Sequence, residues 1–167
     1  MPKLIRLQDG RFDWADDSFT TVGDEDPIPA GDVIVSLKRF MTEDEALLNG
    51  RQVGVLLQPD EAVEDLAYDL PRFAVIALAF PKFLDGRNFS AARLLRERYG
   101  FKGEIRAVGA VLRELALHMV RCGFDAFVPS DGSDSETWAA AAHRYRHVYQ
   151  RAADGAAPAF VERGSGL

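Results

Sequence analysis

The residues best suited to bind or transform a substrate lie where an apolar run gives way to a predicted helix. Two arginines stand here, and their guanidinium groups can hold a carboxylate, a phosphate or a sulfur oxyanion through paired hydrogen bonds. The first N–H groups of a helix lack partners in the chain and carry partial positive charge, which favours the same ligands. We therefore predict a small-anion site formed by Asp85, Gly86, Arg87, Ser90 and Arg93.

Two other interpretations of this segment stay open. Asp85 and Arg87 can form an ion pair that pins a tight turn, with Gly86 adopting a conformation that other residues would find strained. Asp85 can also serve as a base, which makes it a weak candidate for a catalytic residue.

Arg106 is the other charged candidate. It lies in a predicted strand, residues 104–108, and a charge in a covered strand needs a carboxylate or a ligand. Glu104 shares its face of the strand at a spacing of two residues. Arg106 is therefore expected either to join an ion-pair network with Glu104 and Asp85 or to bind a ligand.

The sequence supports no metal or cofactor site. The single cysteine, Cys122, excludes an iron–sulfur cluster, and its place at a helix end predicts a buried structural role. His143 and His147 have the spacing of a metal pair but no obvious third ligand. No glycine-rich phosphate or dinucleotide motif occurs, so neither a flavin nor a nicotinamide is supported.

Charge is distributed unevenly along the 167 residues, whose formal net charge is −6. Residues 9–26 hold seven acidic residues and one arginine, which gives −6. Residues 82–121 hold nine basic and four acidic residues, which gives +5. The total opposes binding to nucleic acid or to an anionic membrane. The basic segment is either a helix surface laced with ion pairs or an anion-binding region.

The chain is expected to be cytoplasmic. Its first residues lack the apolar run of a signal peptide, and its longest apolar stretch, residues 73–81, is far shorter than the roughly 20 residues of a membrane helix. One cysteine allows no internal disulfide.

The hydrophobic pattern predicts one α/β domain over residues 1–153 and a flexible tail over 154–167. A hairpin and an acidic loop occupy residues 1–31, with a turn at Asp9-Gly10. Five apolar runs follow as strands: 33–37, 53–57, 73–80, 104–108 and 124–128. Five predicted helices alternate with these strands. The first begins at Thr42 and ends at Gly50, and the second begins at Asp60. The others span 88–99, include 112–119, and run from Ser133 to about Ala152.

About five such βα units imply parallel strands, in either an open doubly wound sheet or a partial (β/α) barrel. A partial barrel leaves open strand edges, which the hairpin or a second copy in a homodimer would cover. In both architectures ligands bind at the C-terminal ends of the strands, where Asp85 to Arg93 and Gly109 lie.

Three blocks carry a family resemblance: residues 80–98, 103–109 and 121–127. Together they resemble the bacterial domain-of-unknown-function family 934, over roughly residues 33–127. Members are often labelled putative oxidoreductases of sulfite reduction, because their genes tend to lie beside sulfite reductase genes. Members often carry an Asp-Gln pair after the second block, where this chain has Arg113-Glu114-Leu115.

The resemblance implies an accessory protein of assimilatory sulfate or sulfite reduction that binds a small anionic metabolite or docks on sulfite reductase. One alternative is a cofactor-dependent oxidoreductase with an unknown substrate. The other is a non-catalytic interaction subunit, whose acidic residues 9–26 would steer it to a basic partner. Whether the protein is an enzyme stays open.

Overall fold

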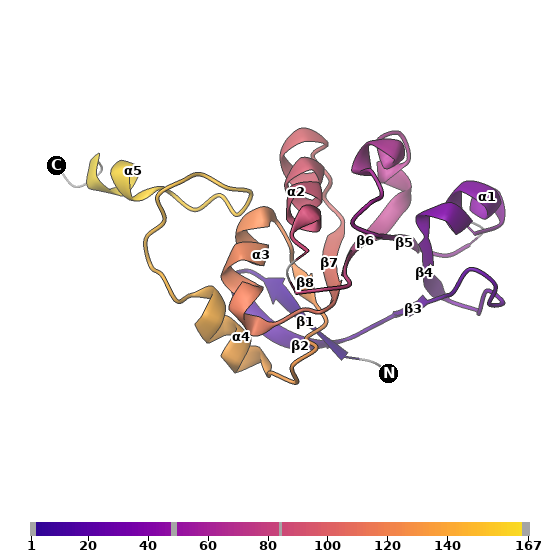
Figure 1. Ribbon diagram of the computed structural model, residues 1–167, viewed down its shortest axis with the longest axis horizontal. Helices are drawn as coiled ribbons and strands as arrows, with labels where there is room; N and C mark the ends of the chain where they lie inside the picture. The colour runs from indigo at the N-terminus through magenta and orange to yellow at the C-terminus, as the bar shows by residue number, and fades with distance from the viewer. Residues whose placement is uncertain (1–2, 48–49, 84, 165–167) are drawn as a thin grey trace.

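A computed structural model describes the chain except for residues 1–2, 48–49, 84 and 165–167. Its framework is one eight-stranded sheet in the order β2-β1-β8-β7-β6-β5-β4-β3 (Figure 1). The strands are β1 (Lys3–Gln8), β2 (Arg11–Asp16), β3 (Phe19–Thr21), β4 (Asp32–Ser36), β5 (Val53–Leu57), β6 (Phe73–Phe80), β7 (Glu104–Gly109) and β8 (Ala126–Phe127). The α-helices are α1 (Leu37–Leu47), α2 (Arg87–Arg93), α3 (Ala116–Cys122), α4 (Ser135–Ala142) and α5 (Ala159–Gly164).

The predicted N-terminal hairpin is confirmed. β1 and β2 pair antiparallel through the turn at Asp9 and Gly10, whose φ angles of 50° and 77° are those of a type I′ turn. β1 also pairs antiparallel with β8. The hairpin therefore covers the edge that β8 would otherwise leave open.

The six remaining strands form the partial barrel and not the doubly wound sheet. β3 to β8 are parallel and follow one another in chain order, whereas a doubly wound sheet reverses its order part-way. The sheet is also strongly curled. Asp17, just before β3, forms a 2.8 Å ion pair with Arg106 in β7, although three strands separate β3 from β7.

The curled sheet has a helix-covered outer face and a concave inner face. Side chains from four helices share one hydrophobic core with the outer face: Phe40, Ala92, Met119 and Trp138. A second, smaller cluster lies on the inner face and consists of Phe19, Ile34, Val75 and Ala77. β6 supplies both clusters, which explains its unbroken apolar sequence.

The βα alternation is only partly as predicted. The connection from β3 to β4 is a loop, and the helix predicted after Asp60 is replaced by two short 3-10 turns, Val63–Leu66 and Leu70–Arg72. α2 continues into a single π turn, Leu94–Arg98, within the predicted range 88–99. β8 has two residues, fewer than the five predicted.

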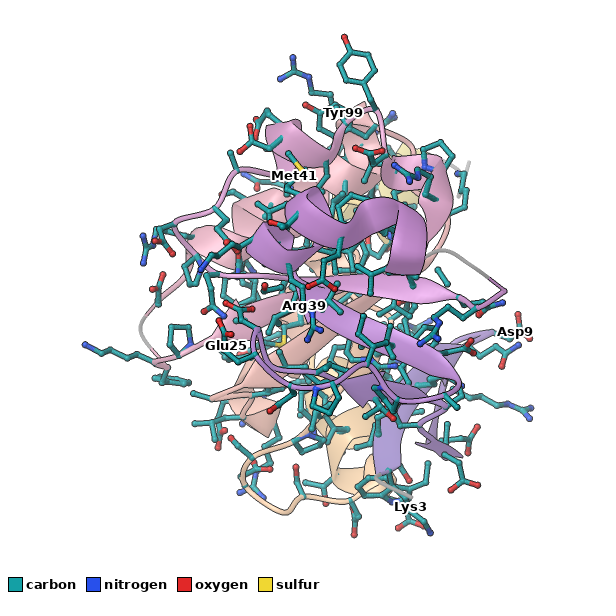
Figure 2. All side chains as sticks on the ribbon, turned by 90° about the vertical axis from the view of Figure 1, so that its right-hand side faces the viewer. Lys3, Asp9, Glu25, Arg39, Met41 and Tyr99 are labelled. Carbon is teal, nitrogen blue, oxygen red and sulfur yellow. The ribbon has the colours of Figure 1, made fainter. Side chains whose placement is uncertain are left out.

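The first helix begins five residues before its predicted start at Thr42. Ser36 caps it instead, because its hydroxyl oxygen accepts a 3.1 Å hydrogen bond from the Arg39 N–H. The Thr42 hydroxyl donates to the Lys38 carbonyl inside the helix. Arg39 also holds the acidic loop, since its guanidinium donates to the Gly23 carbonyl, and Figure 2 shows it beside the loop that carries Glu25.

The last predicted helix is shorter than expected. α4 ends at Ala142 rather than near Ala152. Beyond it the chain turns back, and Val148 forms a parallel bridge with Pro158. Asp134, not Ser133, caps α4, and its carboxylate accepts a 2.8 Å hydrogen bond from the Thr137 N–H. Residues 154–167, predicted as a flexible tail, include the helix α5.

Asp134→Ala is expected to lower the melting temperature of the protein. The decrease should become smaller as the pH falls. Hydrogen bonds from the Thr137 N–H and hydroxyl hold the pKa of Asp134 below its ordinary 3.8. A carboxyl group whose pKa is lower in the folded than in the unfolded state stabilises the fold at pH values above its unfolded pKa. This stabilisation is lost as the pH falls through its folded pKa. Thermal unfolding followed by circular dichroism should show the largest difference from the parent at neutral pH. A difference independent of pH would contradict the role of the charge.

Candidate functional site

Asp85 and Arg87 face each other across the predicted turn after β6. The Arg87 Nε and Nη2 donate to the two carboxylate oxygens of Asp85 over 3.0 and 2.7 Å. The hydrogen bond lowers the pKa of Asp85 and raises the pKa of Arg87. This geometry matches the pinned turn, and a carboxylate of lowered pKa is a poor general base near neutral pH.

The predicted need for glycine at position 86 is wrong. Gly86 has φ −90° and ψ 3°, a conformation open to other residues. A Cβ there would make only an ordinary 3.6 Å contact with the Phe89 ring.

The start of α2 is fixed to the C-terminal edge of the sheet, as predicted. The buried Asn88 amide donates to the carbonyls of Ala79 and Leu57 over 2.7 and 3.5 Å, which ties α2 to the ends of β6 and β5. Ser90 is exposed on α2, but Arg93 pairs with Glu97 at 3.0 Å. The two predicted arginines thus have separate carboxylate partners within the protein.

Arg106 lies at the centre of a buried network on the inner face of the sheet. Its Nε donates to Glu104 over 2.7 Å and its Nη1 to Asp17 over 2.8 Å, while Arg6 donates to the other Glu104 oxygen. The predicted pairing with Glu104 is therefore present. The proposed third member, Asp85, forms its ion pair with Arg87, and Asp17 fills that place.

Most of the basic segment 82–121 is neutralised within the chain. Six of its seven arginines form ion pairs, and Arg98 lies over the ring of Tyr99. The six pairs are Arg87–Asp85, Arg93–Glu97, Arg96–Asp125, Arg106–Asp17, Arg113–Glu114 and Arg121–Asp154. Most of these basic side chains therefore take part in ion pairs within the protein, in agreement with the ion-pair interpretation.

The residues considered for metal or redox chemistry do not converge. His147 contacts Glu162 at 2.6 Å, whereas His143 packs its ring edge against Phe12. Cys122 is buried, and burial raises the pKa of its thiol. Within the described ranges, no three His, Cys, Asp or Glu side chains are grouped to hold a metal ion. The helices traced there are all too short or too polar to cross a membrane.

The comparison with protein families agrees with the sequence resemblance. The model of a bacterial protein of unknown function, DUF934, matches residues 54–160, more than half of the chain. The chain belongs to the DUF934 family. No curated protein matches it. All three resembling blocks of this DUF934 protein lie inside the match, which also extends beyond residue 127 and past the predicted domain end at 153.

That extension reaches into a surface that the sequence analysis did not single out, the C-terminal arm, residues 143–164. Arg121 at the end of α3 anchors it, since its guanidinium binds Asp154 and the Gln150 carbonyl and its own carbonyl accepts from the Ala153 N–H. The arm closes on itself through the contact of His147 with Glu162. It is therefore positioned by specific contacts in this DUF934 protein.

The arm exposes aromatic and basic side chains. Tyr149 is 80% exposed and Phe160 is 65% exposed. Four arginines form no ion pair with any residue in the described part of the chain: Arg144, Arg146, Arg151 and Arg163. The interleaving of arginine with tyrosine in residues 144–151 is the one sequence signal that could have drawn attention to this surface.

Proposed function

We propose that this DUF934 protein is an accessory protein of assimilatory sulfate or sulfite reduction that docks on sulfite reductase through its C-terminal arm. The metabolic assignment rests on the label that members of the family often carry, whereas the matched family model itself describes a protein of unknown function. The observation that carries the docking is the exposed aromatic and arginine side chains of the arm.

Tyrosine and arginine are the residue types that most often dominate binding at protein interfaces. Their large side chains bury apolar area while keeping a polar group for a directed hydrogen bond. The arm's acidic groups, Asp154 and Glu162, already have partners in Arg121 and His147. The arm therefore presents an excess of positive charge, and its docking site on the partner should be acidic.

Docking accounts for the geometry better than a small-anion site at Asp85 to Arg93. An oxyanion that binds Arg87 must displace the two-point contact of Asp85, and one that binds Arg93 must displace Glu97. The arm arginines face no such competition from the described residues.

Biolayer interferometry with sulfite reductase purified from the same organism tests this proposal. The double variant Tyr149→Ala/Phe160→Ala should bind about tenfold more weakly or worse, because two interface anchors are removed. Tyr68→Ala is the matched control, since Tyr68 is 98% exposed but lies between β5 and β6. Added salt should weaken binding of the parent protein as well.

The proposal fails if the parent protein does not bind the reductase, or if Tyr68→Ala weakens binding as much as the arm variant does. Analytical ultracentrifugation of the parent and arm variant alone addresses the proposed homodimer. A dimer that survives the arm substitutions would place self-association elsewhere.

A further inference from the structure

We propose that a cavity behind the arm binds a small organic anion with an apolar body. The cavity has a volume of about 570 Å³ and lies between the arm, α3 and the turn of the β1–β2 hairpin. This volume falls within the usual range of small-molecule sites. Its apolar wall comprises Leu7, Phe12, Leu117, Val120, Phe124 and Val148.

The acidic side chains that line the cavity are already engaged. Asp125 pairs with Arg96 at 2.7 Å, Asp154 with Arg121 at 3.0 Å, and Glu162 with His147 at 2.6 Å. A cationic ligand would have to break one of these pairs. The cavity therefore does not favour cations.

The basic lining differs, because one guanidinium is uncommitted. Arg146 lines the cavity and forms no ion pair with a described residue. His143, three residues before Arg146, also lines the cavity, and its imidazole makes an edge-to-face contact with Phe12 at a centroid distance of 5.7 Å. A carboxylate or sulfonate head at Arg146, with a ring or branched chain against the apolar wall, satisfies both parts of the cavity.

The cavity is distinct from the Asp85 segment, and of the arginines assigned to the docking surface it shares Arg146. Asp125, which lines it, directly precedes β8, so the cavity lies at the N-terminal ends of the strands and not at the C-terminal edge that holds Asp85. Neither Tyr149 nor Phe160 lines it. Because the docking test replaces Tyr149 and Phe160 and the ligand test replaces Arg146, the two proposals can fail separately.

Calorimetric titration with 4-phenylbutyrate and with its neutral amide, 4-phenylbutanamide, tests the inference. The acid should bind about tenfold more tightly than the amide, which corresponds to one charge-assisted hydrogen bond. Arg146→Gln should abolish this preference while leaving weak binding of both probes. Arg144→Gln, a neighbouring arginine outside the cavity lining, should preserve it.

Val120→Trp should abolish binding of both probes by filling the cavity, provided that circular dichroism shows a folded protein. Arg146→Gln keeps the test valid if Val120→Trp does not fold, because Arg146 is exposed. Absence of binding to the parent, equal affinity for acid and amide, or an unchanged preference in Arg146→Gln would each overturn the inference.

Discussion

Arg106→Met is expected to lower the free energy of unfolding by about 3–5 kcal/mol, the usual loss when one partner of a buried ion pair is removed. The Arg106 side chain is 2% exposed, and it neutralises Asp17 and Glu104 on the inner face of the sheet. Without it, Glu104 would keep its ion pair with Arg6, whereas Asp17 would lose the ion pair that neutralises it. Urea unfolding followed by tryptophan fluorescence and circular dichroism measures the loss.

Two comparisons identify the cause of this loss. Arg93→Met removes a half-exposed helix pair, so its effect should be at most about 0.5 kcal/mol. Combining Arg106→Met with Asp17→Asn and Glu104→Gln should recover part of the stability, because the uncompensated charges are then gone. If Arg106→Met lowered the free energy of unfolding no more than Arg93→Met, the network would not be what stabilises the curl of the sheet.

Local patterns predicted the elements that depend on neighbouring residues. The hairpin follows from Asp9-Gly10, and β6 follows from an apolar run that must be covered on both faces. The choice between the two architectures depends instead on strand order, which adjacent residues do not encode. The contact of Asp17 with Arg106, which lie 89 positions apart in the sequence, shows how far the sheet curls.

The same limit applies to the candidate site. The types and spacing of Asp85 and Arg87 indicated either an anion site or a turn pinned by an ion pair. The structure has the ion pair, between residues only two positions apart. The partners of Arg96 and Arg121 lie 29 and 33 positions away. Basic charge therefore could not be divided into paired and free arginines from the sequence alone.

The arm illustrates a different difficulty. Its sequence has no helical or strand hydrophobic period. After α4 ends, the arm is held by tertiary contacts, namely the ion pair of Arg121 with Asp154 and the bridge between Val148 and Pro158. The sequence predicted the start of α4 one residue early, at Ser133 instead of Asp134, but its C-cap residue is His143 and not the glycine that usually indicates a helix end. Helix propensity alone predicted a longer helix, because it takes no account of the tertiary contacts that the chain makes after Ala142.

Gly109→Ala is expected to destabilise the protein by roughly 2–4 kcal/mol, combining left-handed backbone strain with overpacking. Gly109 ends β7 with φ +96°, and a Cβ there would collide with the carbonyl group of Phe80, whose carbon would lie 3.0 Å away. Neither side can yield easily, because the same Phe80 oxygen accepts a 2.6 Å hydrogen bond from the Ala110 N–H. From the sequence, a glycine at this strand end would allow the backbone to approach a ligand; in the structure the close neighbour of Gly109 is the Phe80 carbonyl.

Gly86→Ala is the matched comparison, because both glycines lie at the C-terminal edge of the sheet. Its φ is negative and its added Cβ meets only the Phe89 ring, so the change should be neutral or stabilising by up to about 1 kcal/mol. Urea unfolding of the two variants separates backbone strain from the mere addition of a methyl group. Equal losses in both would mean that the close approach of β7 to Phe80 does not make glycine necessary at position 109.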